Sequence, residues 1–195
     1  MHAIAEADLF DELYRQGQKQ NGDLRTLTAS FIETTTSPLL TRPLVARGTL
    51  AVERPSRIAM RYTEPEPRLV LIDGSRMTLA WPARQIRDVR DVGAALRRIE
   101  KYFVGSSPDE LRRHFTIAAR PADDRPAYLV TMTPKRKQIQ EGVSRLELWV
   151  DRESLLLSAM RLTFATGDTK LMTFSEVIPN AAIDPGVFVE RKRPN

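Results

Sequence analysis

Apolar residues recur at helical spacing in the first twenty positions, and farther along the chain they alternate with polar residues as in β-strands. One stripe of the predicted helix, which covers residues 5–20, contains Leu9, Phe10, Leu13, Tyr14 and Gly17. Asn21-Gly22 follows, and both residues tolerate the left-handed backbone that ends many helices. The pattern therefore predicts one amphipathic helix at the start of the chain.

Ten short segments downstream have the period of two that is typical of half-buried strands. They cover residues 28–35, 47–53, 57–63, 68–72, 77–81, 115–120, 128–133, 144–151, 158–165 and 170–177. Asp73-Gly74 predicts a tight hairpin between the fourth and fifth, because glycine adopts the positive φ that such a turn needs. Most consecutive segments have no helix between them. The chain is therefore predicted to be mainly β with helices (α+β), its antiparallel sheet curled into a barrel or sandwich.

A helical insertion, predicted at about residues 89–114, interrupts the strands. Its apolar residues recur at spacings of four, three and four, as on one side of a helix that ends at Gly105. They are Val92, Leu96, Ile99 and Phe103. A second helix is predicted to begin at Ser107-Pro108-Asp109-Glu110, which combines a capping box with a proline at the first helical position. The apolar stripe of the first helix must be buried against another surface.

Composition excludes several kinds of chemistry. The 195 residues are 42% hydrophobic and 28% charged, which fits a single globular domain over residues 1–195. The chain has no cysteine and two histidines, which disfavours a metal site and catalysis by a thiolate or an imidazole. We expect no metal and no cofactor, and we expect that the protein is not an enzyme. The net charge of +5 comes with 7% aromatic residues and is scattered among acids, which disfavours nucleic acid as a partner.

Residues 1–20 lack the apolar core of a secretory signal peptide, and residues 2–5 resemble the small-residue end of one. We expect a mature secreted chain whose signal peptide is not part of this sequence. A native start at Met1 is the alternative.

Two sets of motifs occur in a specific order along the chain. In the first half, residues 27–31 and a strand that ends in Arg54-Pro55 are followed by a hairpin at Asp73-Gly74. The second half contains residues 146–151, Thr173-Phe174 and residues 183–188. Together these motifs resemble the LolA family of periplasmic lipoprotein carriers, the second set its closing strands, and the resemblance covers about residues 24–188. The chain departs from the family where aromatic residues usually follow Arg-Pro and Asp-Gly.

The resemblance implies an incomplete antiparallel β-barrel (a half-barrel) covered by an α-helical lid. Its hydrophobic cavity would bind the acyl chains of lipoproteins and shuttle them through the periplasm from the inner to the outer membrane. The implied partners are an inner-membrane releasing transporter and an outer-membrane lipid acceptor, and the carrier is expected to be a monomer. A LolA-like carrier of another lipid, such as a glycolipid or a lipidic pigment precursor, is the main alternative. A carboxylate-dependent hydrolase and a β-sandwich interaction module are further rivals.

The site residues are predicted from this resemblance and from strand alternation. In the family the arginine that matches Arg54 bonds backbone carbonyls of the lid and holds it closed, and the helical stripe named above would be the apolar face of the lid. The cavity wall is expected at alternate strand positions, where flexible methionines suit irregular acyl chains. It comprises Leu50, Val52, Ile58, Met60, Leu69, Leu71, Met77, Leu79, Met160, Leu162 and Phe164. Plain core packing is the alternative for each of them, and either strand face could be the concave one.

Overall fold

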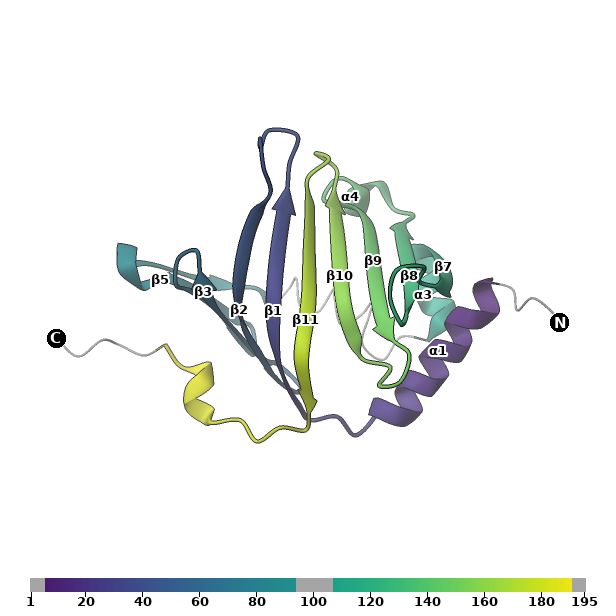
Figure 1. The fold of residues 1–195 in the computed structure, drawn as a ribbon, viewed down its shortest axis with the longest axis horizontal. Helices are drawn as coiled ribbons and strands as arrows, with labels where there is room; N and C mark the ends of the chain where they lie inside the picture. Colours follow the sequence, from purple (N-terminus) through teal and green to yellow (C-terminus); the bar gives the residue numbers. More distant parts are fainter. Residues whose placement is uncertain (1–5, 94–106, 191–195) are drawn as a thin grey trace. The chain divides into compact units, whose positions relative to one another are not determined.

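The computed structural model describes residues 6–93 and 107–190, and eleven antiparallel strands among them form one open sheet (Figure 1). The order across the sheet is β6-β5-β4-β3-β2-β1-β11-β10-β9-β8-β7. The strands are β1 Thr26–Thr36, β2 Leu44–Glu53, β3 Arg57–Glu64, β4 Arg68–Asp73, β5 Arg76–Trp81, β6 Ile86–Asp91, β7 Phe115–Pro121, β8 Ala127–Pro134, β9 Val143–Asp151, β10 Leu157–Phe164 and β11 Thr169–Pro179. The predicted fold class, mainly β with helices and an incomplete antiparallel barrel, is confirmed in that the strands form a single antiparallel sheet that stays open.

The described helices lie before the first strand, between strands and after the last strand. They are α1 Glu6–Asn21, α3 Pro108–His114, α4 Lys137–Gln140 and the two 3₁₀ turns η1 Pro82–Arg84 and η2 Pro185–Phe188. The predicted capping box of α3 is present: Ser107 Oγ accepts from the Glu110 backbone N–H at 3.3 Å, and the Ser107 N–H donates to the Glu110 carboxylate at 3.1 Å. Gly74 has a φ of 58°, as the predicted hairpin requires.

The predicted helical insertion begins too early, because residues 86–91 form strand β6. This strand carries four charged residues and pairs only with β5, at the edge of the sheet. Charged edge strands resist pairing with other chains, and they lack the alternation that marks a half-buried strand. Val92 is half-buried and its N–H donates to the Ser75 carbonyl at 2.7 Å. The other predicted lid residues, Leu96, Ile99 and Phe103, lie outside the described residues.

The chain divides into two compact units. Unit 1 comprises Met1–Asp23, Glu33–Leu44 and Lys101–Thr173, and unit 2 comprises Leu24–Ile32, Val45–Glu100 and Phe174–Asn195. Whether the two units behave as the single domain predicted over residues 1–195 is not decided by this division, and the single domain stays a prediction.

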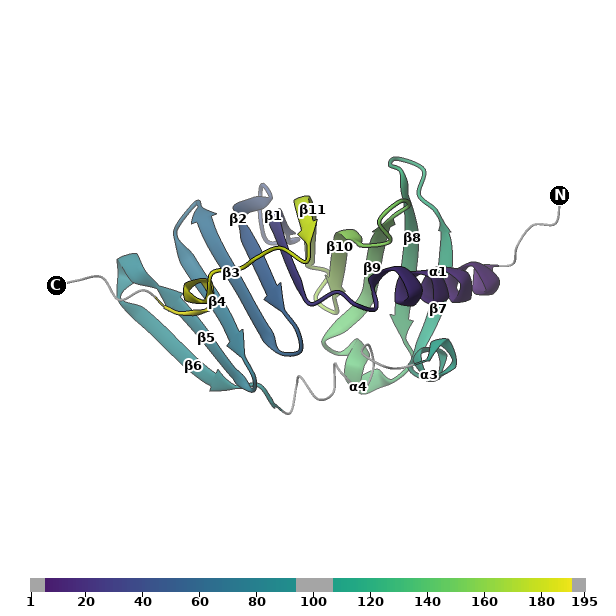
Figure 2. The ribbon, with the colours of Figure 1, turned by 90° about the horizontal axis from the view of Figure 1, so that it is seen from below.

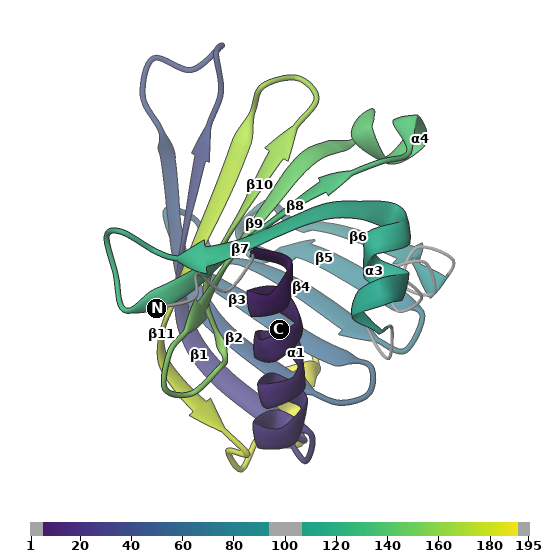
Figure 3. The ribbon, with the colours of Figure 1, turned by 90° about the vertical axis from the view of Figure 1, so that its right-hand side faces the viewer.

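In unit 1, α1 and α3 pack beside β7 (Figure 3). Their apolar side chains and those of β7 and β8 form a core of Phe10, Leu13, Leu111, Phe115, Ala119, Val130 and Met132. The end of α1 is held by the turn after β9, where Gln20 and Asn21 donate side-chain hydrogen bonds to the Ser154 carbonyl, each at 3.0 Å. The alternate positions of β8 and β9 carry a second cluster around Trp149 and Leu129.

In unit 2, η2 packs on β3 and β4 (Figure 2). Phe188 of η2 packs with small and apolar side chains on one face of strands β2 to β5: Ala51, Ala59, Leu69, Leu71 and Ala80. Arg61 fastens this segment, since its guanidinium donates to the Val187 carbonyl at 2.6 Å and to the Val189 carbonyl at 2.9 Å. Close approach on the other face requires Gly48, because a Cβ there would lie 2.2 Å from the Arg61 carbonyl oxygen and 2.8 Å from the Phe31 ring.

Candidate functional site

Two rows of apolar side chains cross strands β2 to β5 in unit 2. The ladder register aligns Leu50 with Met60, Val70 and Leu79, and it aligns Val52 with Ile58, Ile72 and Met77. Residues two apart on a strand face the same way, so these eight side chains share one face of the four strands. All eight are half-buried, in contrast to the buried residues under η2 on the opposite face. We call these eight residues the apolar rows.

Charged groups border the apolar rows. On β6 the register continues the first row with Asp88 and the second with Arg90, and these two residues form an ion pair at 2.6 Å. Toward one end of the strands, the Arg68 guanidinium lies 3.7 Å from the centre of the Tyr62 ring. The face is thus apolar within and charged at its border, as is common in sites for hydrophobic ligands.

Six predicted wall residues belong to the apolar rows, and two others do not. Leu69 and Leu71 lie on the opposite face of β4, where they are 5% and 7% exposed and pack with Phe188. They therefore cannot line the same surface as the other six. Val70 and Ile72 take their places. The register of the hairpin shows that Val70 and Ile72 share a face with Leu79 and Met77. Its two-residue turn, which follows Asp73, pairs Val70 with Leu79 and Ile72 with Met77.

The remaining predicted wall residues, Met160, Leu162 and Phe164, alternate along β10 in unit 1. All three are half-buried. Met160 pairs with Leu148 and Leu162 with Leu146, and both partners pack against the core under α1. The three side chains therefore lie on the strand face that bears this helical core, next to the part of it that α1 and α3 cover.

Arg54 is exposed in the turn between β2 and β3, and its backbone N–H donates to the Arg25 carbonyl at 2.8 Å. Within the described residues, no hydrogen bond or ion pair involves its guanidinium. Arg61 does bind backbone carbonyls, and it thereby holds η2. Sequence reasoning missed Arg61 because nothing in the sequence of β3 distinguishes it from the other arginines of the chain.

A family model and related proteins match most of the chain. The family model described as outer membrane lipoprotein carrier protein LolA matches residues 22–190. The chain belongs to the LolA family. It is 29% identical over 171 residues to an outer-membrane lipoprotein carrier protein of Dechloromonas aromatica, covering 84% of this chain and 76% of that one. The carrier of Methylibium petroleiphilum is 27% identical over 166 residues, covering 85% and 78%.

Solved structures share the fold of this LolA family member at low sequence identity. An uncharacterized conserved protein from Thermus thermophilus has a TM-score of 0.58 at 8% identity, over 94% of this chain and 95% of that one. The Mycobacterium tuberculosis lipoprotein LppX has a TM-score of 0.52 at 11% identity, over 90% and 97%. Within residues 6–93 and 107–190, no helix has the length and apolar character needed to cross a bilayer.

Proposed function

We propose that this LolA family protein carries lipoproteins through the periplasm by binding their acyl chains on the apolar rows of unit 2. The observation that carries the proposal is the register of these rows: eight half-buried apolar side chains on one face of four strands, bordered by charge. The names of its relatives, outer-membrane lipoprotein carrier proteins, support the same cargo. Met160, Leu162 and Phe164 of unit 1 are proposed as further acyl-chain contacts.

The free energy of acyl transfer explains why a carrier is needed. A chain of about 14 methylenes gains about 11 kcal/mol on leaving water, at about 0.8 kcal/mol for each methylene. Lipidated cargo therefore does not leave a membrane for water on a useful timescale. A carrier must offset part of this gain if it is to release the cargo again.

The predicted lid supplies that offset in the proposal. Val92, Leu96, Ile99 and Phe103 occupy the apolar rows when no cargo is bound, and the acyl chains displace them. Arg54 holds the lid closed by donating to its backbone carbonyls, a task suited to a planar guanidinium with five donors. Leu96→Glu is expected to abolish loading while the circular dichroism spectrum is retained. Unchanged loading would remove the lid assignment.

Release of a lipoprotein from membranes tests the proposal directly. Spheroplasts that display a labelled triacylated lipoprotein on the inner membrane are incubated with the purified protein, and the soluble fraction is analysed by native mass spectrometry. A soluble one-to-one complex is expected, and transfer to outer-membrane vesicles should follow through a membrane-bound acceptor. If the purified protein instead retains a glycolipid or pigment precursor and releases no lipoprotein, the proposed cargo is wrong.

A further inference from the structure

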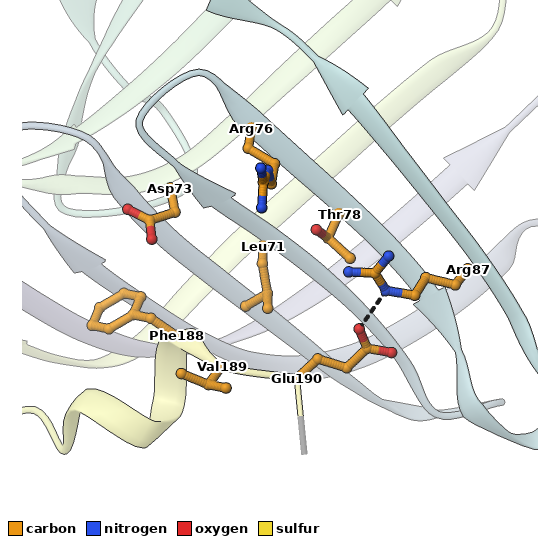
Figure 4. A pocket seen from close by; sticks show the side chains of 8 residues that line it. All are labelled: Leu71, Asp73, Arg76, Thr78, Arg87, Phe188, Val189 and Glu190. Atoms are coloured by element: carbon orange, nitrogen blue, oxygen red, sulfur yellow. Dashed lines mark hydrogen bonds and ion pairs between the residues drawn. The ribbon is translucent and has the colours of Figure 1, made fainter. Parts of the chain in front are cut away.

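Unit 2 contains a pocket on the face opposite to the apolar rows, with a volume of about 600 Å³ (Figure 4). Leu71 of β4 and Phe188, at the end of η2, contribute apolar walls, and both side chains are buried. This volume lies within the range of about 300–1,000 Å³ that is typical of small-molecule sites. The pocket is thus large enough for a small organic ligand, and it is separate from the proposed acyl-chain surface.

The side chain of Thr78 on β5 faces this pocket (Figure 4). Thr78 as a whole is 6% exposed. Among the residues that the structure describes, no side-chain hydrogen bond engages its hydroxyl, and the hydroxyl oxygen is not fully enclosed. The Thr78 hydroxyl is therefore open to the pocket and available to a ligand.

Two arginines, Arg76 and Arg87, also line this pocket. Arg76 lies two residues before Thr78 on the same strand face, and Arg87 comes from the neighbouring strand β6 (Figure 4). Arg87 is paired with the carboxylate of Glu190 at 2.7 Å. The Arg76 guanidinium has no ion pair with any described residue, although the pocket also contains Asp73. The Asp73 carboxylate lies 3.8 Å from the Arg57 guanidinium, which helps to neutralise it.

We propose that this pocket binds the phosphate group of an organic phosphate ester. Arg76 and the Thr78 hydroxyl donate to the phosphate oxygens, and Leu71 and Phe188 contact the organic part. The Glu190 carboxylate forms an ion pair with Arg87, and the phosphate competes with this carboxylate for the guanidinium.

The arrangement of donors favours a phosphate over a carboxylate. A tetrahedral phosphate presents three oxygens in different directions, which suits the three donor side chains here: Arg76 and Thr78 from β5 and Arg87 from β6. A planar carboxylate has two coplanar oxygens, and the chain already places one such group, Glu190, on Arg87 alone. The Glu190 carboxylate thus pairs with Arg87, and it leaves Arg76 and the Thr78 hydroxyl to donate to another group.

Isothermal titration of the full chain with sn-glycerol 3-phosphate, at constant ionic strength, tests this site. Arg76→Gln is expected to weaken binding about tenfold or more, because it removes a charge-assisted contact. Glu190→Gln is expected to tighten binding several-fold, because it frees Arg87. The control is Arg145→Gln, which removes the same charge from an exposed position of β9 in unit 1 and should leave the affinity unchanged.

A second arm identifies the source of the phosphate. Co-sedimentation with phosphatidylglycerol vesicles, compared with phosphatidylcholine vesicles, is measured for the same three variants. Arg76-dependent binding to the soluble ester but not to vesicles supports a free metabolite, and Arg76-dependent binding to vesicles supports a lipid headgroup. Equal losses in Arg76→Gln and Arg145→Gln, or no saturable binding in either arm, would overturn the proposal.

Discussion

Replacing Met60 and Leu79 together by alanine should separate acyl-chain binding from folding stability. Both residues belong to the first apolar row, on either side of Val70. If an acyl chain gains about 11 kcal/mol and the eight row side chains share that contact, each contributes about 1.4 kcal/mol. Alanine retains Cβ, so we expect a loss of about 1 kcal/mol for each substitution. One strand, β4, lies between the two sites, which puts them about 9–10 Å apart, and the losses should add to about 2 kcal/mol.

This loss corresponds to about 30-fold weaker binding, at about 1.4 kcal/mol for each factor of ten. The affinity is measured by displacement of a fluorescent fatty acid from the delipidated protein. Both side chains are half-buried, so the double variant should unfold in urea at nearly the same midpoint as the parent protein.

Leu69→Ala is the matched control, since Leu69 lies on the opposite face of β4 and is 5% exposed. Its truncation should lower the free energy of unfolding by about 2–4 kcal/mol and leave acyl-chain affinity unchanged. The reasoning is refuted if Leu69→Ala loses binding as much as the double variant does, or if the double variant binds like the parent.

Three further predictions concern single residues. Arg54→Leu should load lipoprotein normally but transfer it to acceptor membranes poorly, whereas Arg54→Lys should transfer in part; equal transfer by parent and Arg54→Leu would contradict the latch. Gly48→Ala should destabilise unit 2 by about 1–3 kcal/mol, because the new Cβ would clash with the Arg61 carbonyl oxygen. The control Gly17→Ala, which has open space around it in α1, should stabilise the protein by up to about 1 kcal/mol. Thermal melts measure both changes. The pKa of Asp151 lies below its ordinary value because its carboxylate accepts from the Ser154 backbone N–H at 2.8 Å and from the Ser154 hydroxyl at 2.9 Å. The stability that this lowered pKa adds is present above the unfolded-state pKa and is lost as the pH falls below about 4. Urea midpoints measured at a series of pH values test this, and an equal fall in midpoint at low pH for Asp151→Asn and for the parent would contradict it.

Much of the fold could be predicted because the signals are local. The alternation in residues 144–151 and 158–165 corresponds to β9 and β10 within two residues, since a pleated strand sets its own period of two. The capping box at Ser107 places the start of α3 for a similar reason, because its two hydrogen bonds lie within one turn. Strand β6 escaped prediction because its residues are mostly charged and exposed, so burial imposes no pattern on it.

The candidate site was only half predictable for a related reason. Alternation shows that Leu69 and Val70 lie on opposite faces, but it does not say which face is covered. That choice depends on η2, a segment far along the chain, which brings Phe188 onto Leu69 and Leu71.

The amino-acid sequence was sufficient to predict ten of the eleven strands, the main hairpin and the family, because each depends on backbone geometry or on short motifs in order. Which face of β4 is covered depends on the tertiary structure, in which Phe188 packs on Leu69 and Leu71 and leaves Val70 and Ile72 in the apolar rows. The tertiary structure also assigned Arg61 to η2 and brought Thr78, Arg76 and Glu190 to one pocket. These contacts join residues that are distant along the chain, and their free energy depends on burial and on charge pairing, which exist only after the strands have assembled.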